Sequence, residues 1–154
     1  MTGKKSNNEN GKRFFIGTID GRLIAIDAKT GEAISSVGKD GTVDLKEGFG
    51  SDISVTSPPA IIGNLVVIGS SLGDNQRFDY PRGTVRAYDA ISGELRWSWD
   101  PIPQDSTDKA WQTWNGPKAH RTGAANAWSI ISADAERDLV FIPTSCASPD
   151  YYGG

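Results

Sequence analysis

The amino-acid sequence predicts an all-β fold, specifically part of a β-propeller with about two to three blades of four-stranded antiparallel sheet. The main observation is a repeated hairpin, because GRLIAIDAKTGEAI at 21–34 matches GTVRAYDAISGELR at 83–96. A second element, the strand-like segment at 11–18, recurs at 63–70 and in part at 138–142. Repeats of this kind are typical of stacked sheet units. The alternative to a propeller is an open sandwich or another kind of meander.

The first blade is predicted at 13–36, after a polar leader at 1–12. Its strands are expected at 13–18, 22–27 and, more weakly, 32–36. Asp27 and Gly31 bound the turn between the last two, because Asp accepts backbone hydrogen bonds and Gly adopts positive φ without strain. A polar connector follows at 37–54, with a short strand expected at 42–45.

The second blade is predicted to be complete, at 56–100. Its four strands are expected at 57–62, 65–70, 84–89 and 94–99, and Gly63-Asn64 predicts a two-residue type I′ turn between the first two. The third blade begins at 126–154 with strands expected at 128–133 and 139–144, joined by a turn at 135–138. The abrupt start and the half-blade at the end lead us to expect a fragment of a longer protein.

Composition excludes several classes of protein. The 154 residues carry a net charge of −3 and no basic run, so nucleic acid is not an expected partner. No apolar run approaches the roughly 20 residues of a membrane helix. The single cysteine, Cys146, rules out a disulfide within the chain.

Strand order predicts where a functional site lies. In an antiparallel meander the first strand starts at the same sheet edge where the second one ends, so the long loops meet there and the tight turns lie opposite. The loop between the second and third strands is ten residues longer in the second blade than in the first. Long loops on a rigid scaffold carry binding sites. The segments expected at this edge are residue 56 and the ranges 71–82, 101–126 and 145–154.

The segment AYDAISGELRW at 87–97 resembles the tryptophan-docking repeat of quinoprotein dehydrogenases, which are eight-bladed propellers that hold pyrroloquinoline quinone (PQQ). Three loop stretches strengthen the resemblance: SVTSPP at 54–59, GSSLGDN at 69–75, and RTGAANAW at 121–128 followed by PTSCASPDYYGG at 143–154. Together they are similar to the glucose dehydrogenase branch. The resemblance implies a periplasmic protein whose parent is attached to the inner membrane.

The resemblance also implies site residues. Trp128 is expected to lie flat under PQQ, because an indole is a wide apolar plate. Thr56, Ser71 and Asn126 are expected to hydrogen-bond the cofactor. Asp74 and Asn75 are expected to contact the cofactor and to bind Ca²⁺ or Mg²⁺, because hard cations prefer oxygen ligands. The remaining tryptophans are expected to be packing residues: Trp97, Trp99, Trp111 and Trp114.

The function implied is oxidation of glucose or a related sugar or polyol, with electrons passing to a membrane quinone. The alcohol-oxidising branch carries an adjacent pair of cysteines over PQQ, and a chain with only Cys146 lacks that pair, which favours the sugar branch. The family's general base lies in a later blade, so these residues alone are expected to be inactive. The alternative function is a non-enzymatic propeller scaffold for protein interaction, of the outer-membrane assembly type.

Overall fold

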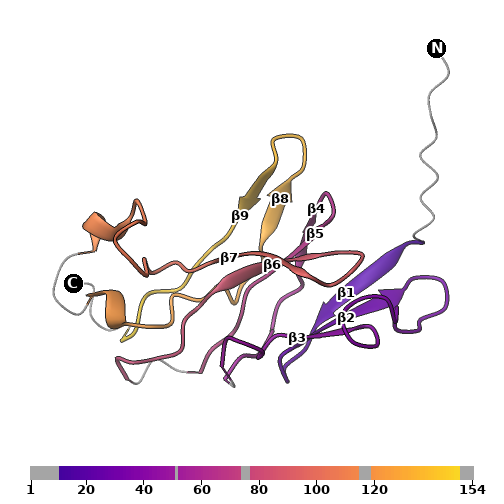
Figure 1. Cartoon of the computed structure of the whole chain (residues 1–154), viewed down its shortest axis with the longest axis horizontal. Coiled ribbons are helices and arrows are strands. Elements are labelled where there is room, and N and C mark those ends of the chain that lie inside the picture. Colours follow the sequence, from indigo (N-terminus) through magenta and orange to yellow (C-terminus); the bar gives the residue numbers. More distant parts are fainter. Residues whose placement is uncertain (1–10, 51, 74–76, 115–118, 150–154) are drawn as a thin grey trace, which may run out of the picture.

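The computed structural model describes residues 11–50, 52–73, 77–114 and 119–149, which form three antiparallel sheets that follow one another along the chain (Figure 1). Two single-turn 3₁₀ helices, η1 (Trp111–Thr113) and η2 (Ala119–Arg121), occur in the segment of chain that connects the second sheet to the third. In these ranges no helix has the length and apolar character needed to cross a membrane. The all-β prediction is confirmed. The strands are β1 (Arg13–Gly17), β2 (Arg22–Asp27), β3 (Thr42–Asp44), β4 (Ala60–Ile62), β5 (Leu65–Ile68), β6 (Val85–Asp89), β7 (Leu95–Trp99), β8 (Ser132–Asp134) and β9 (Leu139–Phe141).

The first sheet has the order β1-β2-β3, and its third strand corrects the prediction. The expected strand at 32–36 is wrong, because only Ala33 bridges to Ile26 before the chain turns away. The short strand expected at 42–45 is present as β3, and it pairs with the beginning of β2. The place beside β2 is thus occupied by two separate segments: Ala33 pairs with the end of β2, and β3 pairs with its beginning.

The excursion at 34–41 has a clear physical cause. The Gly38 amide donates a hydrogen bond to the carbonyl of Ser92 in the second sheet's turn, at 2.8 Å. Gly41 then brings the chain back so close that an added Cβ would lie 2.8 Å from the Cβ of Ala33. The interrupted strand therefore gains a contact with the next sheet.

The second sheet has the order β4-β5-β6-β7, which confirms the predicted four-stranded meander. Its strands are shorter than expected, chiefly β4, which starts at Ala60 rather than at residue 57. The two-residue turn after β4 has φ of +54° at Gly63 only. A type I′ turn needs positive φ at both central residues, so the predicted type is wrong and the turn is of the II′ kind.

The third sheet contains β8 and β9, joined by the expected turn at 135–138. The strand expected at 128–133 begins later, at Ser132. Trp128, before this strand, is bound to the segment that precedes β4, since its carbonyl accepts hydrogen bonds from the hydroxyls of Thr56 and Ser57. The Trp128 backbone is therefore held by a contact with the second unit, outside the β8–β9 ladder.

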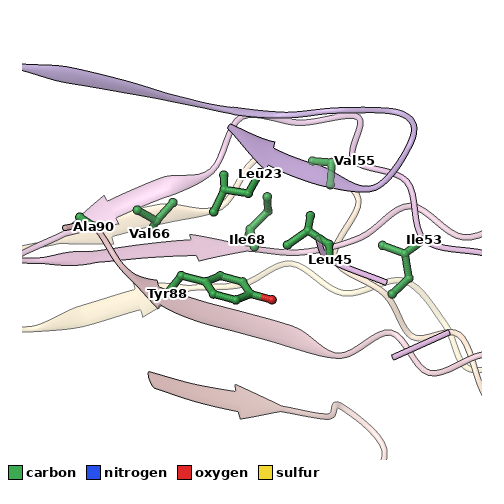
Figure 2. Packing of buried hydrophobic residues seen from close by; sticks show 8 residues of the cluster. All are labelled: Leu23, Leu45, Ile53, Val55, Val66, Ile68, Tyr88 and Ala90. Atoms are coloured by element: carbon green, nitrogen blue, oxygen red, sulfur yellow. The ribbon is translucent and has the colours of Figure 1, made fainter. Parts of the chain in front are cut away.

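The first hydrophobic cluster fills the space between the first and second sheets (Figure 2). Leu23 comes from β2, Val66 and Ile68 come from β5, and Tyr88 comes from β6. The turn after β6 adds Ala90, and the connector between the sheets supplies the remaining members: Leu45, Ile53 and Val55. Figure 2 shows these side chains gathered between the strands and the connector.

The second cluster lies between the second and third sheets. Val67, Val85 and Ala87 point there from the second sheet, and Ala127 and Ile131 meet them from the start of the third unit. Alternate residues of β5 and β6 therefore point to opposite faces of the second sheet. Because both faces are covered, every residue of β6 is buried. Packing of sheet on sheet through both faces is the arrangement expected for neighbouring propeller blades.

Arg86 is a fully buried cation that sequence analysis did not anticipate. Its Nη1 donates to the Leu45 carbonyl at 2.5 Å, and the guanidinium lies 4.5 Å from the centre of the Phe49 ring. Its Nε and Nη2 have no hydrogen-bond partner. Burial lowers the pKa of Arg86, the expected direction for a cation removed from water.

Candidate functional site

The long loops gather at one edge of the sheets, as the meander predicted. We call this edge the loop face; its described residues are 52–58, 70–73, 77–84, 119–131 and 143–149. Three isolated bridges join segments distant in sequence: Ser54 with Ser71, Arg82 with Ala124, and Ala124 with Ala147. The loop face is therefore a continuous, hydrogen-bonded surface across the second and third sheets.

Thr56 and Trp128 occupy equivalent places in successive blades. Ser54 exchanges backbone hydrogen bonds with Ser71, which follows β5. In the next blade the amide of Ser145, which follows β9, donates to the Asn126 carbonyl at 3.0 Å. Thr56 lies two residues after Ser54, and Trp128 lies two residues after Asn126. The repeat therefore brings both predicted site residues to the same level of the loop face.

Trp128 is the centre of the candidate site. Its side chain is 55% exposed although it is the largest apolar residue on the loop face. The Trp128 carbonyl accepts hydrogen bonds from Ser57 Oγ at 2.5 Å and from Thr56 Oγ1 at 3.3 Å. These residues share a shallow pocket with the buried Ser70. An exposed indole bordered by hydroxyl groups can bind a flat ligand that carries oxygen atoms.

Asn126 lies behind Trp128 and is 5% exposed. Its side-chain amide donates to the Ser70 carbonyl at 2.8 Å, and its Oδ1 accepts from Ser145 Oγ at 3.1 Å. The same residue thus ties together the ends of β5 and β9. Asn126 therefore lies behind the predicted site residues Thr56 and Trp128, and its side-chain amide links the second blade to the third.

Ser70 and Ser71 lie side by side at the end of β5 but differ in environment. Ser71 is half-buried, and its backbone is paired with Ser54. Ser70 is almost fully buried, and its hydroxyl has no hydrogen-bond partner. Sequence analysis missed Ser70 and Ser57, because a lone hydroxyl carries no signal until the topology places it beside Trp128.

Glycines allow the blades to approach one another closely at this site. An added Cβ at Gly69 would lie 2.0 Å from the Ala127 carbonyl oxygen, and one at Gly83 would lie 2.4 Å from that of Ala124. Ala124 and Ala125 are both left-handed, with φ of +58° and +53°. A left-handed conformation strains residues that carry a Cβ, so the segment before Trp128 is held in a shape that the isolated chain disfavours.

The connector between the second and third sheets is tied to the loop face by Arg82. Its guanidinium lies 3.4 Å from the Asp100 carboxylate and donates to the His120 carbonyl at 3.3 Å. Burial raises the pKa of Asp100, against the opposing effects of the Ile102 amide and Arg82. The His120 ring stacks on Trp111 at 3.4 Å between ring centres. Trp111 therefore packs as expected.

The predicted metal ligands Asp74 and Asn75 lie outside the described residues. Within the described ranges no group of three or more His, Cys, Asp or Glu side chains is placed to hold a metal ion. Cys146 is exposed, and its thiol is free. The metal site therefore stays a prediction from sequence.

The whole chain, residues 1–154, matches the family model described as "PQQ: Glucose/ethanol/alcohol dehydrogenase, beta-propeller domain". It is 38% identical to a quinate/shikimate dehydrogenase (quinone) of Acinetobacter baylyi, over 97% of this chain and 18% of that protein. It is 38% identical to a glycerol dehydrogenase large subunit of Gluconobacter thailandicus, over 91% of this chain and 19% of that protein. Quinoprotein glucose dehydrogenase A of Acinetobacter calcoaceticus is 33% identical over 98% of this chain and 19% of its own length.

Solved structures show the same architecture. The quinohemoprotein alcohol dehydrogenase of Comamonas testosteroni matches with a TM-score of 0.68 and 29% identity, over 89% of this chain and 20% of that one. A europium-containing methanol dehydrogenase matches with a TM-score of 0.66 and 25% identity, over 88% of this chain and 24% of that one. The chain spans about a fifth of the length of these curated relatives.

Proposed function

The chain belongs to the PQQ family of glucose, ethanol and alcohol dehydrogenase β-propellers, and from this premise we propose that it forms part of a PQQ-dependent dehydrogenase acting on CH–OH groups. The single observation that carries the proposal is the exposed indole of Trp128 in one pocket with the Thr56 hydroxyl. Family membership supports this enzymatic function over the alternative of a propeller scaffold.

The residues present fit the cofactor. PQQ is flat and carries carboxylate and quinone oxygens, so it needs a wide apolar surface and hydrogen-bond donors. Trp128 supplies the surface, and Thr56 supplies a hydroxyl donor in the same pocket. Ser71, which follows β5, is the second donor that we propose. The Ser70 hydroxyl, buried and without a partner, is a further donor beside the pocket.

When bound, PQQ accepts the hydride equivalent that leaves an alcohol carbon. The part of this chain is to bind and orient: Trp128 covers one face of the ring and excludes water from it, and Thr56 and Ser71 fix the ring's rotation. In this proposal Asn126 acts behind the pocket, where its amide is bonded to Ser70 and Ser145. A direct contact of Asn126 with the cofactor stays a prediction.

We propose Ca²⁺ or Mg²⁺ as the metal, held by Asp74 and Asn75 together with groups from elsewhere in the protein. The proposal is supported by the position of residues 74–75 in the enlarged loop after Ser71. A carboxylate next to a carboxamide offers the oxygen ligands that such cations prefer.

The proposed substrate is a sugar or polyol, with glucose as one candidate, and the proposed acceptor is a membrane quinone reached from the periplasm. Relatives with 33–38% identity are named for quinate or shikimate, glycerol and glucose, and one of these names includes a quinone. These substrates share a secondary alcohol or hemiacetal carbon flanked by further hydroxyls, which is the chemistry that we assign.

The test is reconstitution of the natural protein that carries these residues with PQQ and Ca²⁺ or Mg²⁺. Glucose, quinate, glycerol and ethanol are compared as substrates with a dye acceptor and with a soluble ubiquinone analogue, against a control without PQQ. We expect PQQ-dependent turnover of at least one sugar or polyol. Absence of PQQ-dependent dye reduction with all four substrates would refute the proposal.

A further inference from the structure

We propose that Ser57 is a positioning residue that holds the Trp128 backbone, so that the neighbouring Thr56 hydroxyl is free to bind the cofactor. This inference rests on the proposed function and adds a residue to its site. Ser57 precedes two prolines, lies outside the set predicted from sequence, and reaches Trp128 across 71 residues of chain.

The first step of the argument is the geometry at one carbonyl. The Trp128 oxygen accepts from two adjacent hydroxyls, Ser57 at 2.5 Å and Thr56 at 3.3 Å. Hydroxyl hydrogen bonds are strongest near 2.7 Å and weaken with distance, so Ser57 makes the principal bond. Ser57 is half-buried, whereas Thr56 is exposed. The exposed hydroxyl is the one that a ligand on the loop face can reach.

The second step is that the chain before Trp128 is already fixed. Asn126 is bonded through its side chain to Ser70 and Ser145. Ala127 packs directly on Gly69, where no Cβ would fit. With the preceding residues held in this way, the hydrogen bonds at the Trp128 carbonyl tie the backbone of the indole-bearing residue itself to the second blade.

The third step is the consequence for binding. If Ser57 holds the carbonyl, Thr56 can rotate its hydroxyl toward a ligand without releasing Trp128. If Ser57 is lost, Thr56 becomes the carbonyl's partner, and a ligand must compete for the same hydroxyl. Loss of Ser57 therefore weakens cofactor binding through Thr56 and loosens Trp128.

The test uses the natural protein with four variants: Ser57→Ala, the conservative Ser57→Thr, Thr56→Val, and Ser98→Ala as a control on the exposed side of β7. The first readout is ¹⁹F NMR of the cofactor-free protein labelled with 5-fluorotryptophan. The Trp128 resonance is assigned as the one missing from Trp128→Phe. We expect Ser57→Ala to shift or broaden that resonance alone, and Ser57→Thr and Ser98→Ala to leave it in place.

The second readout is the dissociation constant for PQQ. We expect Ser57→Ala to raise it about threefold to tenfold, the effect of one neutral hydrogen bond, and Ser57→Thr to restore it. Thr56→Val is expected to raise it without moving the Trp128 resonance of the cofactor-free protein. An unchanged resonance and an unchanged constant in Ser57→Ala would overturn the inference. Failure of the unsubstituted protein to bind PQQ would instead overturn the proposed function, while the NMR result still decides the role of Ser57.

Discussion

Two tryptophans of the chain have opposite environments. Trp97, on β7, is partly buried and packs against the second cluster. Trp128 is 55% exposed at the loop face, with only its backbone held by the neighbouring blade. The area of indole removed from water determines what each contributes to stability. Substitution of each tryptophan therefore distinguishes a contribution to packing from the proposed contribution to cofactor binding.

We predict that Trp128→Ala changes the free energy of unfolding by less than about 1 kcal/mol but raises the PQQ dissociation constant more than about tenfold. The matched variant Trp97→Ala is expected to destabilise by about 2 kcal/mol or more, because it opens a cavity between blades. Chemical denaturation and PQQ titration of both variants measure the two effects. Equal loss of stability in the two variants would show that Trp128 is a packing residue.

Asp89 is the most strongly perturbed carboxylate among the described residues. The Ser92 amide, the Arg96 guanidinium and the Ile91 amide together lower its pKa to about 2. A pKa lowered by folding means that the charged carboxylate stabilises the fold. That stabilisation is complete above the unfolded pKa near 3.9 and is lost as the pH falls from there through about 2.

Asp89→Asn is therefore expected to lower the free energy of unfolding by about 1–2 kcal/mol at pH 7, allowing for solvent screening. The difference between the variant and the unsubstituted protein is expected to be smaller at pH 2. Glu94→Gln is the matched control, because Glu94 is exposed and makes a longer ion pair, at 3.7 Å, with the same Arg96. Its effect is expected to be within about 0.5 kcal/mol at both pH values. Urea denaturation at pH 7, 4 and 2 measures the difference, and a constant deficit for Asp89→Asn across that range would contradict the account.

At this scale the sequence predicted part of the site. Thr56, Ser71, Asn126 and Trp128 lie at one sheet edge, because their place in the repeat fixes them there, and Thr56 and Trp128 share one pocket. Their role in binding a cofactor stays a prediction. Ser57 and Ser70 could not be predicted, because their roles depend on contacts with a segment more than fifty residues away. The buried Arg86 was also unpredictable, since an Arg in an alternating strand normally faces water.

At the scale of elements, the repeated hairpins differ in what their glycines contact. Gly31 and Gly93 end equivalent turns and have nearly the same φ, +75° and +76°. An added Cβ at Gly31 would meet nothing within 4 Å. At Gly93 it would lie 2.6 Å from the Gly38 amide nitrogen of the first blade. Only the second turn is therefore also a contact between blades.

We predict that Gly31→Ala costs about 1–2 kcal/mol, the usual penalty for a side chain in the left-handed region. Gly93→Ala is expected to cost about 1–3 kcal/mol more, because the new methyl group collides with the first blade. The difference in urea midpoint between the two variants isolates the contact between blades. Equal costs would mean that the excursion at 34–41 does not pack on the second sheet.

The prediction of elements was correct where local chemistry decides the outcome. Asp27, Asp89 and Asp134 each accept amide hydrogen bonds from residues two and three positions later. The third of these turns ends at Asp138, with φ of +55° where the other two have glycine. Prediction was wrong at 32–36, because contact with the neighbouring blade interrupts a strand that local propensity favours.

At the scale of the whole molecule, stability comes from clusters between sheets rather than within one sheet. Both faces of the second sheet are covered. The outer faces of the first and third sheets are not. Phe14 is 62% and Ile16 46% exposed on β1, while Phe141 is 55% exposed on β9. Exposed apolar side chains in alternate strand positions are typical of surfaces that pack against another sheet.

The 154-residue chain by itself is therefore expected to self-associate in a concentration-dependent manner. Sedimentation over a hundredfold range of concentration measures this, and Phe14→Lys together with Phe141→Lys is expected to reduce it by placing charge on both faces. A monomer at every concentration, with a sharp and concentration-independent thermal transition, would contradict the expectation.

The central claim is that Trp128 and Thr56 form one wall of a PQQ site at the loop face. The most direct measurement is an experimental structure of the natural protein with PQQ bound. We predict the cofactor ring stacked on the Trp128 indole, with one of its oxygens within about 3 Å of Thr56 Oγ1. A cofactor bound elsewhere, or a Trp128 side chain covered by another blade and out of contact with PQQ, would contradict the claim.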